Sequence, residues 1–159
     1  MVHSTIDNEL IKQSLISAKI IAMVGVSSIK KESTIIRRRP SFIVMKYLQE
    51  FGYRVIPVNP FSVGKKIYGE TVVASLTDIT IPVDVVNVFR PSKETPVIAK
   101  QAVEIRAKTL WLQYGIQNQE TQEIADSANI IYISNRCIKQ EYQRLFLKMN
   151  PVFPALQTD

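Results

Sequence analysis

Short apolar runs alternate with longer amphipathic stretches along this chain of 159 residues. Most of the runs are rich in β-branched residues, and several are nearly continuous rather than alternating with polar positions. Continuous runs of this kind are typical of strands in a sheet that is covered on both faces. Five strands are therefore predicted, over residues 20–24, 53–58, 83–89, 109–112 and 130–133.

Between the predicted strands, apolar residues recur at spacings of three and four, as on the buried face of a helix. The clearest case runs from Ser41 to Phe51, and Gly52 ends it as a C-terminal glycine does. Ser41 is the expected N-cap of this helix. Four more helices are predicted, over residues 7–18, 92–107, 118–128 and 138–148.

This order of strands and helices predicts the fold class. Strands that alternate with helices build βαβ units and a parallel sheet with right-handed crossovers. We expect a single α/β domain over residues 1–159, with a five-stranded parallel sheet and helices on both faces. Its core spans about residues 8–148, and the tail at 150–159 is expected to be irregular. Ligands of such sheets bind beyond the carboxyl ends of the strands.

Composition excludes several classes of function. Cys137 is the only cysteine and His3 the only histidine, so we expect no disulfide, no structural zinc site and no Ser/His/Asp triad. We expect a cytoplasmic protein, because no disulfide framework or secretory leader is visible. The apolar run from Ile20 to Val26 is far shorter than the roughly 20 residues of a membrane helix, so no membrane partner is expected.

Positive charge is concentrated in one loop. The net charge is +6, and residues 30–39 hold five basic side chains against the single acid Glu32. The basic residues of this window are Lys30, Lys31, Arg37, Arg38 and Arg39. A surplus of this kind predicts a polyanionic partner, either nucleic acid, a membrane surface or a phosphorylated small molecule.

The residues after the first predicted strand suit a phosphate group. Gly25 allows the backbone to approach a ligand, Ser27 and Ser28 offer hydroxyl donors, and the next helix presents unpaired N–H groups. An ordinary turn with a solvated basic loop accounts for the same residues equally well. The NAD fingerprint G-x-G-x-x-G is missing, and Asn59 and Pro60 follow the second strand where that pattern has an acid.

The other strand ends offer further polar and aromatic groups but no pair of acids. Lys65 and Lys66 are either phosphate ligands or ordinary surface lysines, and Phe89 belongs either in the core or beside an adenine. Gly115, after the fourth strand, would allow close contact. Cys137, after the fifth, is expected to be a buried small hydrophobe rather than a nucleophile.

Taken in order, eight segments resemble the stand-alone CoA-binding proteins, which are similar to the CoA-binding domain of the succinyl-CoA synthetase alpha subunit. They include IAMVGVS at 21–27, GYRVIPVNP at 52–60, VDVVNVFRP at 83–91, LWLQYG at 110–115 and RCIKQE at 136–141. The match runs from about residue 8 to about residue 146. It implies a Rossmann-like sheet that holds coenzyme A, or an acyl-CoA, across its strand ends.

The resemblance also implies which residues contact coenzyme A. Those at the pyrophosphate and the following helix start would be Gly25, Ser27, Ser28, Arg39 and Ser41. Those at the adenosine would be Pro57, Val58, Asn59 and Pro60, with Lys65 or Lys66 near a phosphate. The far wall would be Phe89, Arg90 and Pro91, and Gln113 and Gly115 would lie toward the pantetheine arm.

This chain departs from the family in two places. The loop between Ser28 and Arg39 is longer and more basic than usual, and Asn135 and Tyr142 stand where the family has an acid and a histidine around its last cysteine. The synthetases also use a catalytic histidine and a nucleotide-activating domain that this sequence lacks. We therefore expect a CoA-binding protein that is not an enzyme and contains no metal.

Two other functions stay open. An NAD(P)-dependent oxidoreductase fits the fold, and a nucleic-acid-binding protein fits the basic loop 30–39, although no helix-turn-helix or RNA-binding sheet motif is visible. Nucleic acid is the less favoured partner for that reason. A homo-oligomer or a complex with another protein is compatible with the sequence.

Overall fold

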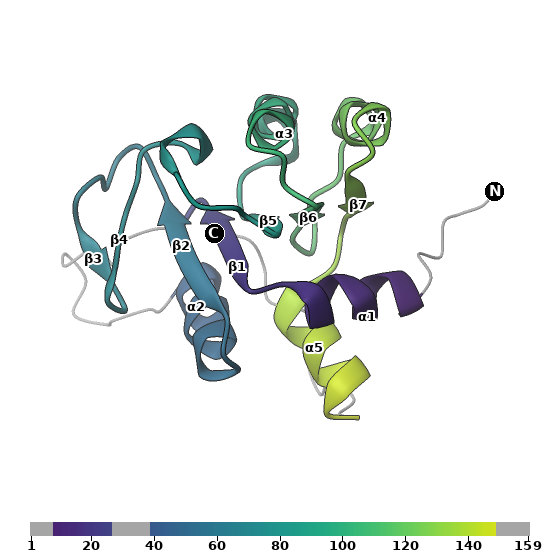
Figure 1. The fold of residues 1–159 in the computed structure, drawn as a ribbon, viewed down its shortest axis with the longest axis horizontal. Helices are drawn as coiled ribbons and strands as arrows, with labels where there is room; N and C mark the ends of the chain where they lie inside the picture. Colours follow the sequence, from purple (N-terminus) through teal and green to yellow (C-terminus); the bar gives the residue numbers. More distant parts are fainter. Residues whose placement is uncertain (1–7, 27–38, 149–159) are drawn as a thin grey trace.

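Five parallel strands form the central sheet of the computed structural model, which describes residues 8–26 and 39–148 (Figure 1). They are β1 (Ile20–Val24), β2 (Arg54–Val58), β5 (Val85–Val88), β6 (Thr109–Leu112) and β7 (Ile131–Ile133). Their order in the sheet is β2-β1-β5-β6-β7, with every neighbouring pair parallel. The predicted five-stranded parallel sheet is confirmed.

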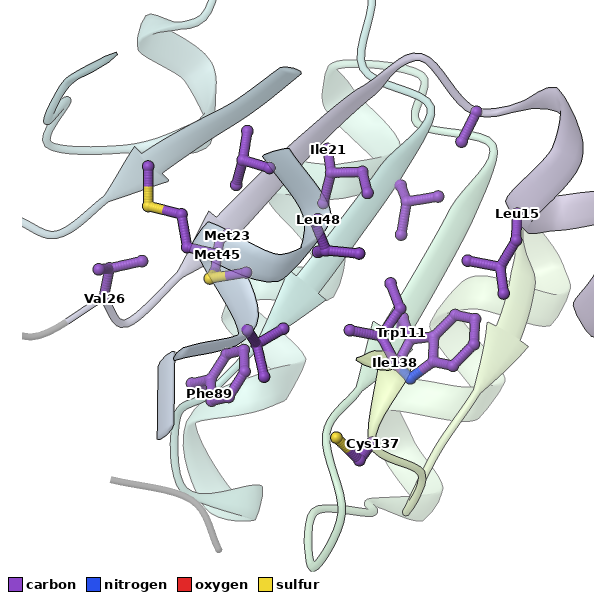
Figure 2. Packing of buried hydrophobic residues seen from close by; sticks show 14 of the residues in the cluster. Leu15, Ile21, Met23, Val26, Met45, Leu48, Phe89, Trp111, Cys137 and Ile138 are labelled. Carbon is purple, nitrogen blue, oxygen red and sulfur yellow. The ribbon is translucent and has the colours of Figure 1, made fainter. Parts of the chain in front are cut away.

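Helices cover both faces of the sheet, as predicted. Figure 1 shows α3 (Thr95–Glu104) and α4 (Gln119–Ser127) on one face, and α1 (Asn8–Ser17), α2 (Pro40–Glu50) and α5 (Ile138–Phe146) on the other. Each face has its own apolar cluster. Figure 2 shows the cluster under α1, α2 and α5, where Trp111 is fully buried and Cys137 is also buried. The predicted burial of Cys137 is confirmed.

The start of α2 differs from the prediction. Its N-cap is Arg39 rather than Ser41, and Pro40 occupies the first turn. Proline suits this position because its fixed φ is already helical and its missing N–H would have no helical partner. Ser41 therefore lies inside the helix and is fully buried. The predicted end is confirmed, since Gly52 has a φ of +95° and Tyr53 N donates to Leu48 O at 3.1 Å.

Short elements that the sequence pattern did not predict lie between the strands. A hairpin joins β3 (Lys66–Ile67) to β4 (Glu70–Thr71) through Tyr68 and Gly69, which both have positive φ values. Strands of two residues are too short to show a period. The helix predicted over 92–107 is divided into the 3-10 turn η2 (Ser92–Glu94) and α3. A second 3-10 turn, η1, covers Leu76–Asp78.

The strand order determines where the sheet can hold a ligand. From β1 the chain goes to β2 on one side and then crosses to β5 on the other side of β1. Connections that leave neighbouring strands in opposite directions open a crevice at their carboxyl ends. The fold therefore directs attention to the residues after β1, β2 and β5. In the described ranges, no helix has the length and apolar character needed to cross a membrane.

Candidate ligand-binding site

A cavity of about 430 Å³ lies beyond the carboxyl ends of β1, β2 and β5. Its volume is within the range of small-molecule sites, roughly 300–1,000 Å³. Val24 and Gly25 line it from β1, and Val58, Asn59, Pro60 and Phe61 from β2 and the loop after it. The remaining lining residues come from the segment after β5, namely Arg90, Lys93, Glu94, Val97, Ile98 and Gln101.

Gly25 brings two strand ends close together. Its φ is +96° and its N–H donates to Val58 O at 2.9 Å. A Cβ at this position would lie 2.8 Å from Arg90 Cδ and 3.1 Å from Phe89 O. Side chains rarely adopt such a φ, and real Cβ atoms do not approach another atom this closely. The sequence predicted that Gly25 lets the backbone approach a ligand, and in this structure the Arg90 side chain lies beside it.

Asn59 shapes the loop after β2. Its Nδ2 donates to Val26 O at 2.8 Å, and its Oδ1 accepts from Phe61 N at 2.8 Å. Both polar atoms of the Asn59 side-chain amide therefore form hydrogen bonds to backbone groups. The loop presents Phe61 with 87% of its surface exposed, although an aromatic ring of this size is usually at least partly buried.

Two exposed apolar side chains line the same cavity. Phe61 comes from the loop after β2, and Val97, which is 62% exposed, comes from α3. Val58 and Ile98 are buried and add to the same apolar lining. Such a surface suits a planar ring, because apolar area that water would otherwise contact is covered on binding.

An ion pair provides the main charges of the cavity. The Arg90 Nη2 lies 3.0 Å from Glu94 Oε2 and 3.1 Å from Oε1, and the Arg90 Nε lies 3.2 Å from Oε1. The two side chains are 40% and 41% exposed. Lys93 adds a second positive charge next to this pair. Arginine in this arrangement can bind a phosphate group with the donors that Glu94 does not use.

The structure gathers some of the predicted residues at this cavity and places others elsewhere. Gly25, Val58, Asn59, Pro60 and Arg90 line it together. The residues that do not line it but belong to the surrounding framework are Arg39, Ser41, Pro57, Phe89 and Pro91. Lys66 lines a second cavity with Arg54 and Glu70, and Lys65 is exposed beside it.

Ser27, Ser28 and the basic residues at 30–38 lie outside the described residues.

Gln113 and Gly115 have structural partners at the end of β6. Gln113 is fully buried, and its Oε1 accepts from Ile138 N at 3.3 Å and from Asn87 Nδ2 at 3.4 Å. The Gly115 N–H donates to Asn135 Oδ1 at 2.7 Å. These bonds tie the end of β6 to the segment after β7 and to the start of α5.

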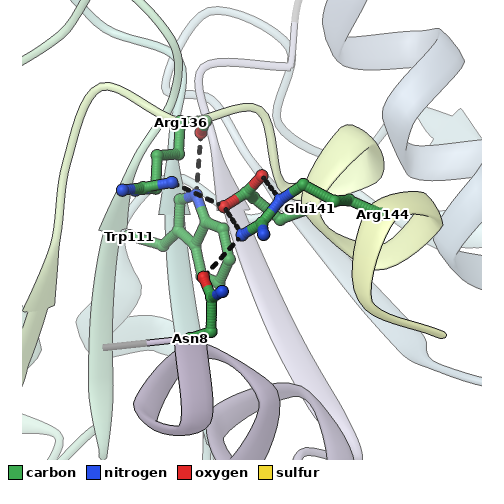
Figure 3. Close-up of polar contacts among 5 residues, drawn as sticks. All are labelled: Asn8, Trp111, Arg136, Glu141 and Arg144. Atoms are coloured by element: carbon green, nitrogen blue, oxygen red, sulfur yellow. Dashed lines mark hydrogen bonds and ion pairs between the residues drawn. The ribbon is translucent and has the colours of Figure 1, made fainter. Parts of the chain in front are cut away.

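A second polar network lies beyond β7 (Figure 3). Glu141 is only 8% exposed and binds Arg136 Nη1 at 2.8 Å and Arg144 Nη2 at 2.9 Å. Hydrogen bonding to Glu141 raises the pKa of the Arg144 guanidinium above its ordinary value. Arg144 also donates to Asn8 Oδ1 at 3.0 Å, and Trp111 Nε1 donates to Arg136 O at 2.8 Å. The network therefore joins α5 to α1 and β6.

Sequence reasoning missed Phe61 and the lining from α3. Glu94, Val97, Ile98 and Gln101 are spaced by three and four, so they share one side of the helix. They also follow closely after Arg90, which was predicted. Their spacing, directly after a strand end, could have pointed to these residues. The sequence alone, however, does not indicate which side of α3 faces the carboxyl edge of the sheet.

Comparisons with known proteins agree on one family. A family model described as a CoA binding domain matches residues 19–143. The uncharacterised protein YneT of Bacillus subtilis is 36% identical over 129 residues, which cover 81% of this chain and 89% of that protein. A solved structure from Thermus thermophilus has a TM-score of 0.79 and 37% identity, over 89% of this chain and 100% of that one. A hypothetical protein from Pyrococcus horikoshii has a TM-score of 0.78 and 37% identity, over 91% and 99%.

Proposed function

The chain belongs to the CoA binding domain family, and we propose that it holds coenzyme A, or an acyl-CoA, in the cavity beyond β1, β2 and β5. One observation carries the proposal. The cavity at the switch point of the sheet combines an apolar lining with an arginine that can receive phosphate. Coenzyme A has the matching chemistry, since it joins a planar adenine to a pyrophosphate and a 3′-phosphate.

Each part of the cavity suits a different part of this ligand. In the proposal, the adenine covers the exposed Phe61 and Val97, and the phosphates bind Arg90 and Lys93. Gly25 leaves room for the Arg90 side chain at the end of β1, where the phosphates would lie. The uncharged pantetheine arm then continues along the strand ends toward Gln113 and Gly115.

We also propose that the protein binds its ligand without catalysing a reaction. The only carboxylate lining the described cavity is Glu94, which is already paired with Arg90. Cys137 is buried and is not among the lining residues. A role as a carrier or sensor of CoA in the cytoplasm fits this chemistry, because a single buried thiol requires no oxidising compartment.

Calorimetry with coenzyme A, NAD and a DNA duplex tests the proposed function. We expect coenzyme A to bind more tightly than NAD, and its affinity to fall less with salt than that of a DNA duplex. Equal or tighter NAD binding would overturn the proposal. DNA binding that exceeds CoA binding and falls steeply with salt would favour the nucleic-acid alternative instead. Mass spectrometry of small molecules released from the purified protein gives an independent identification.

A further inference from the structure

Glu94 is an unexpected group in a cavity that would hold several phosphates. It lines the cavity next to Arg90 and Lys93, so the charged side chains of the described lining are two cations and one anion. A carboxylate repels a nearby phosphate, and it takes donors from Arg90 that a phosphate could otherwise use. Its presence therefore needs a physical reason.

Holding Arg90 in place is not a sufficient reason. The stem of Arg90 already lies against Gly25, where an added Cβ would be 2.8 Å from Arg90 Cδ. The ion pair itself is about 40% exposed on each side, and pairs of this exposure contribute little to stability. A pair that contributes so little to stability leaves an effect on the ligand as the reason for the carboxylate.

The geometry limits how far any phosphate on Arg90 can be from Glu94. Glu94 takes the Nε and Nη2 side of the guanidinium at 3.0–3.2 Å. A phosphate oxygen must use the remaining donors, at a hydrogen-bond length of about 3 Å. The carboxylate and the phosphate then lie about 6 Å apart, on adjacent edges of one planar group. At that separation, partly exposed charges still interact within the Debye length of about 8 Å.

We propose that Glu94 is a specificity-determining residue, which makes the cavity accept a diphosphate that continues as an uncharged arm and disfavour a nucleoside triphosphate. This inference rests on the proposed function. Beyond its pyrophosphate, coenzyme A continues as neutral pantetheine. A triphosphate continues instead with a third, doubly charged phosphate. The carboxylate adds repulsion to that third group and leaves the neutral arm unaffected.

ADP and ATP test the role of Glu94, because they differ only in the third phosphate. For the unaltered protein we expect ATP to bind no more tightly than ADP. In Glu94→Gln, which retains an oxygen acceptor for Arg90, the ratio of ATP affinity to ADP affinity should rise about fivefold. That change corresponds to about 1 kcal/mol. Glu94→Asp keeps the charge and should leave the ratio within twofold of the unaltered protein.

Glu50→Gln is the matched control. Glu50 also pairs with a cation four residues away, since it lies 3.8 Å from Lys46, but this exposed pair is on α2 and outside the cavity. The ratio of ATP affinity to ADP affinity in Glu50→Gln should equal that of the unaltered protein. The effect of Glu94→Gln should also shrink in high salt, which a purely structural effect would not do.

Two failures can be told apart. If the unaltered protein does not bind coenzyme A, the proposed function is wrong and this inference falls with it. If it binds coenzyme A but Glu94→Gln changes the ATP to ADP ratio less than twofold, the role of Glu94 alone is wrong. Circular dichroism of each variant checks that it is folded. If Glu94→Gln does not fold, Glu94→Ala takes its place with the same expected rise in the ratio.

Discussion

The two halves of the carboxyl edge of the sheet use polar residues in opposite ways. Beyond β6 and β7, Gln113 and Glu141 are buried and bound to partners on α5 and its neighbours. Beyond β1, β2 and β5, Arg90 and Glu94 are partly exposed, and Phe61 projects from the surface. We refer to these regions as the closed half and the open half.

The difference teaches that a position after a strand is not enough to make a binding residue. In the closed half, α5 begins close to the end of β6, and its first N–H bonds to Gln113. In the open half, the chain goes from β1 to β2 on one side of β1 and then to β5 on the other, and described residues after these strands line a cavity. Polar side chains of the same kinds are therefore held by structural partners in one half and available to the phosphates of a ligand in the other.

The largest expected effect comes from Glu141→Ala in the closed half. Its two arginine partners would lose a shared carboxylate, and the free energy of unfolding should fall by about 2 kcal/mol. Both arginines reach water, which keeps the loss below that of a fully buried pair. Urea denaturation measures the loss, and calorimetry should give a CoA affinity within twofold of the unaltered protein. A tenfold loss of CoA affinity in the folded variant would show that the closed half binds the ligand.

Gly25→Ala should affect stability and binding together. The positive φ and the contact with Arg90 Cδ should lower the free energy of unfolding by about 1–2 kcal/mol. Displacement of Arg90 should also lower the affinities for ADP and for CoA about tenfold. Gly115→Ala is the control, since its φ is +88° but a Cβ there would meet no atom within 4 Å. It should show a similar strain while ADP affinity stays within twofold.

Phe61→Ala should change binding and leave stability intact. Its ring is exposed in the ligand-free protein, so the free energy of unfolding should stay within about 0.5 kcal/mol. Loss of the ring from the proposed adenine contact should weaken CoA about fivefold, or about 1 kcal/mol. Calorimetry measures the affinity, and Phe61→Leu should recover part of it. If the CoA affinity of Phe61→Ala is unchanged, the proposed contact between the Phe61 ring and the adenine is wrong.

The smallest effect is expected from Asp84→Asn, at the opposite edge of the sheet. Asp84 resembles Glu141 in having several partners, because it accepts from Lys19 N at 2.8 Å and Ile20 N at 3.0 Å and pairs with Lys108 at 3.4 Å. Partial burial favours a higher pKa for Asp84, but these partners together hold the pKa below its ordinary value. The variant should lose up to about 1 kcal/mol at neutral pH.

The pH dependence of this loss has a definite sign. A carboxyl group with a lowered pKa in the folded state stabilises the fold above its unfolded pKa of about 4. That contribution disappears as the pH falls through the folded value. The difference in unfolding free energy between Asp84→Asn and the unaltered protein should therefore shrink from pH 7 to pH 3. A difference that grows on acidification would contradict this assignment, and exposed Asp126→Asn is the control.

Much of the fold could be predicted from local patterns, with errors that have local causes. The strands at 20–24 and 109–112 have the predicted bounds. Ser41 was assigned as the N-cap because its side chain suits that position, but the N-cap is Arg39, two residues earlier, and the helix begins at Pro40. The β3–β4 hairpin was missed because two-residue strands have no detectable period.

The candidate site was predicted less completely than the fold. Arg90 and Asn59 were found because each directly follows a strand, and the family resemblance supported both. Lys93, Glu94 and Val97 were missed because they lie in η2 and α3, farther along the chain than the strand end itself. Phe89 and Phe61 illustrate the same limit, since both follow strands, yet Phe89 is 1% exposed and Phe61 is 87% exposed.

Local patterns along the chain specify the parallel sheet, the two helical layers and the edge that carries the carboxyl ends of the strands. Apolar periodicity is a local property, and strands joined by helices must run parallel with their carboxyl ends together. Which half of that edge is open, and which side chains line it, cannot be read from these local patterns. Both depend on the order β2-β1-β5-β6-β7 and on the helix that packs beside each strand end. Both are long-range choices that no single segment of the chain encodes.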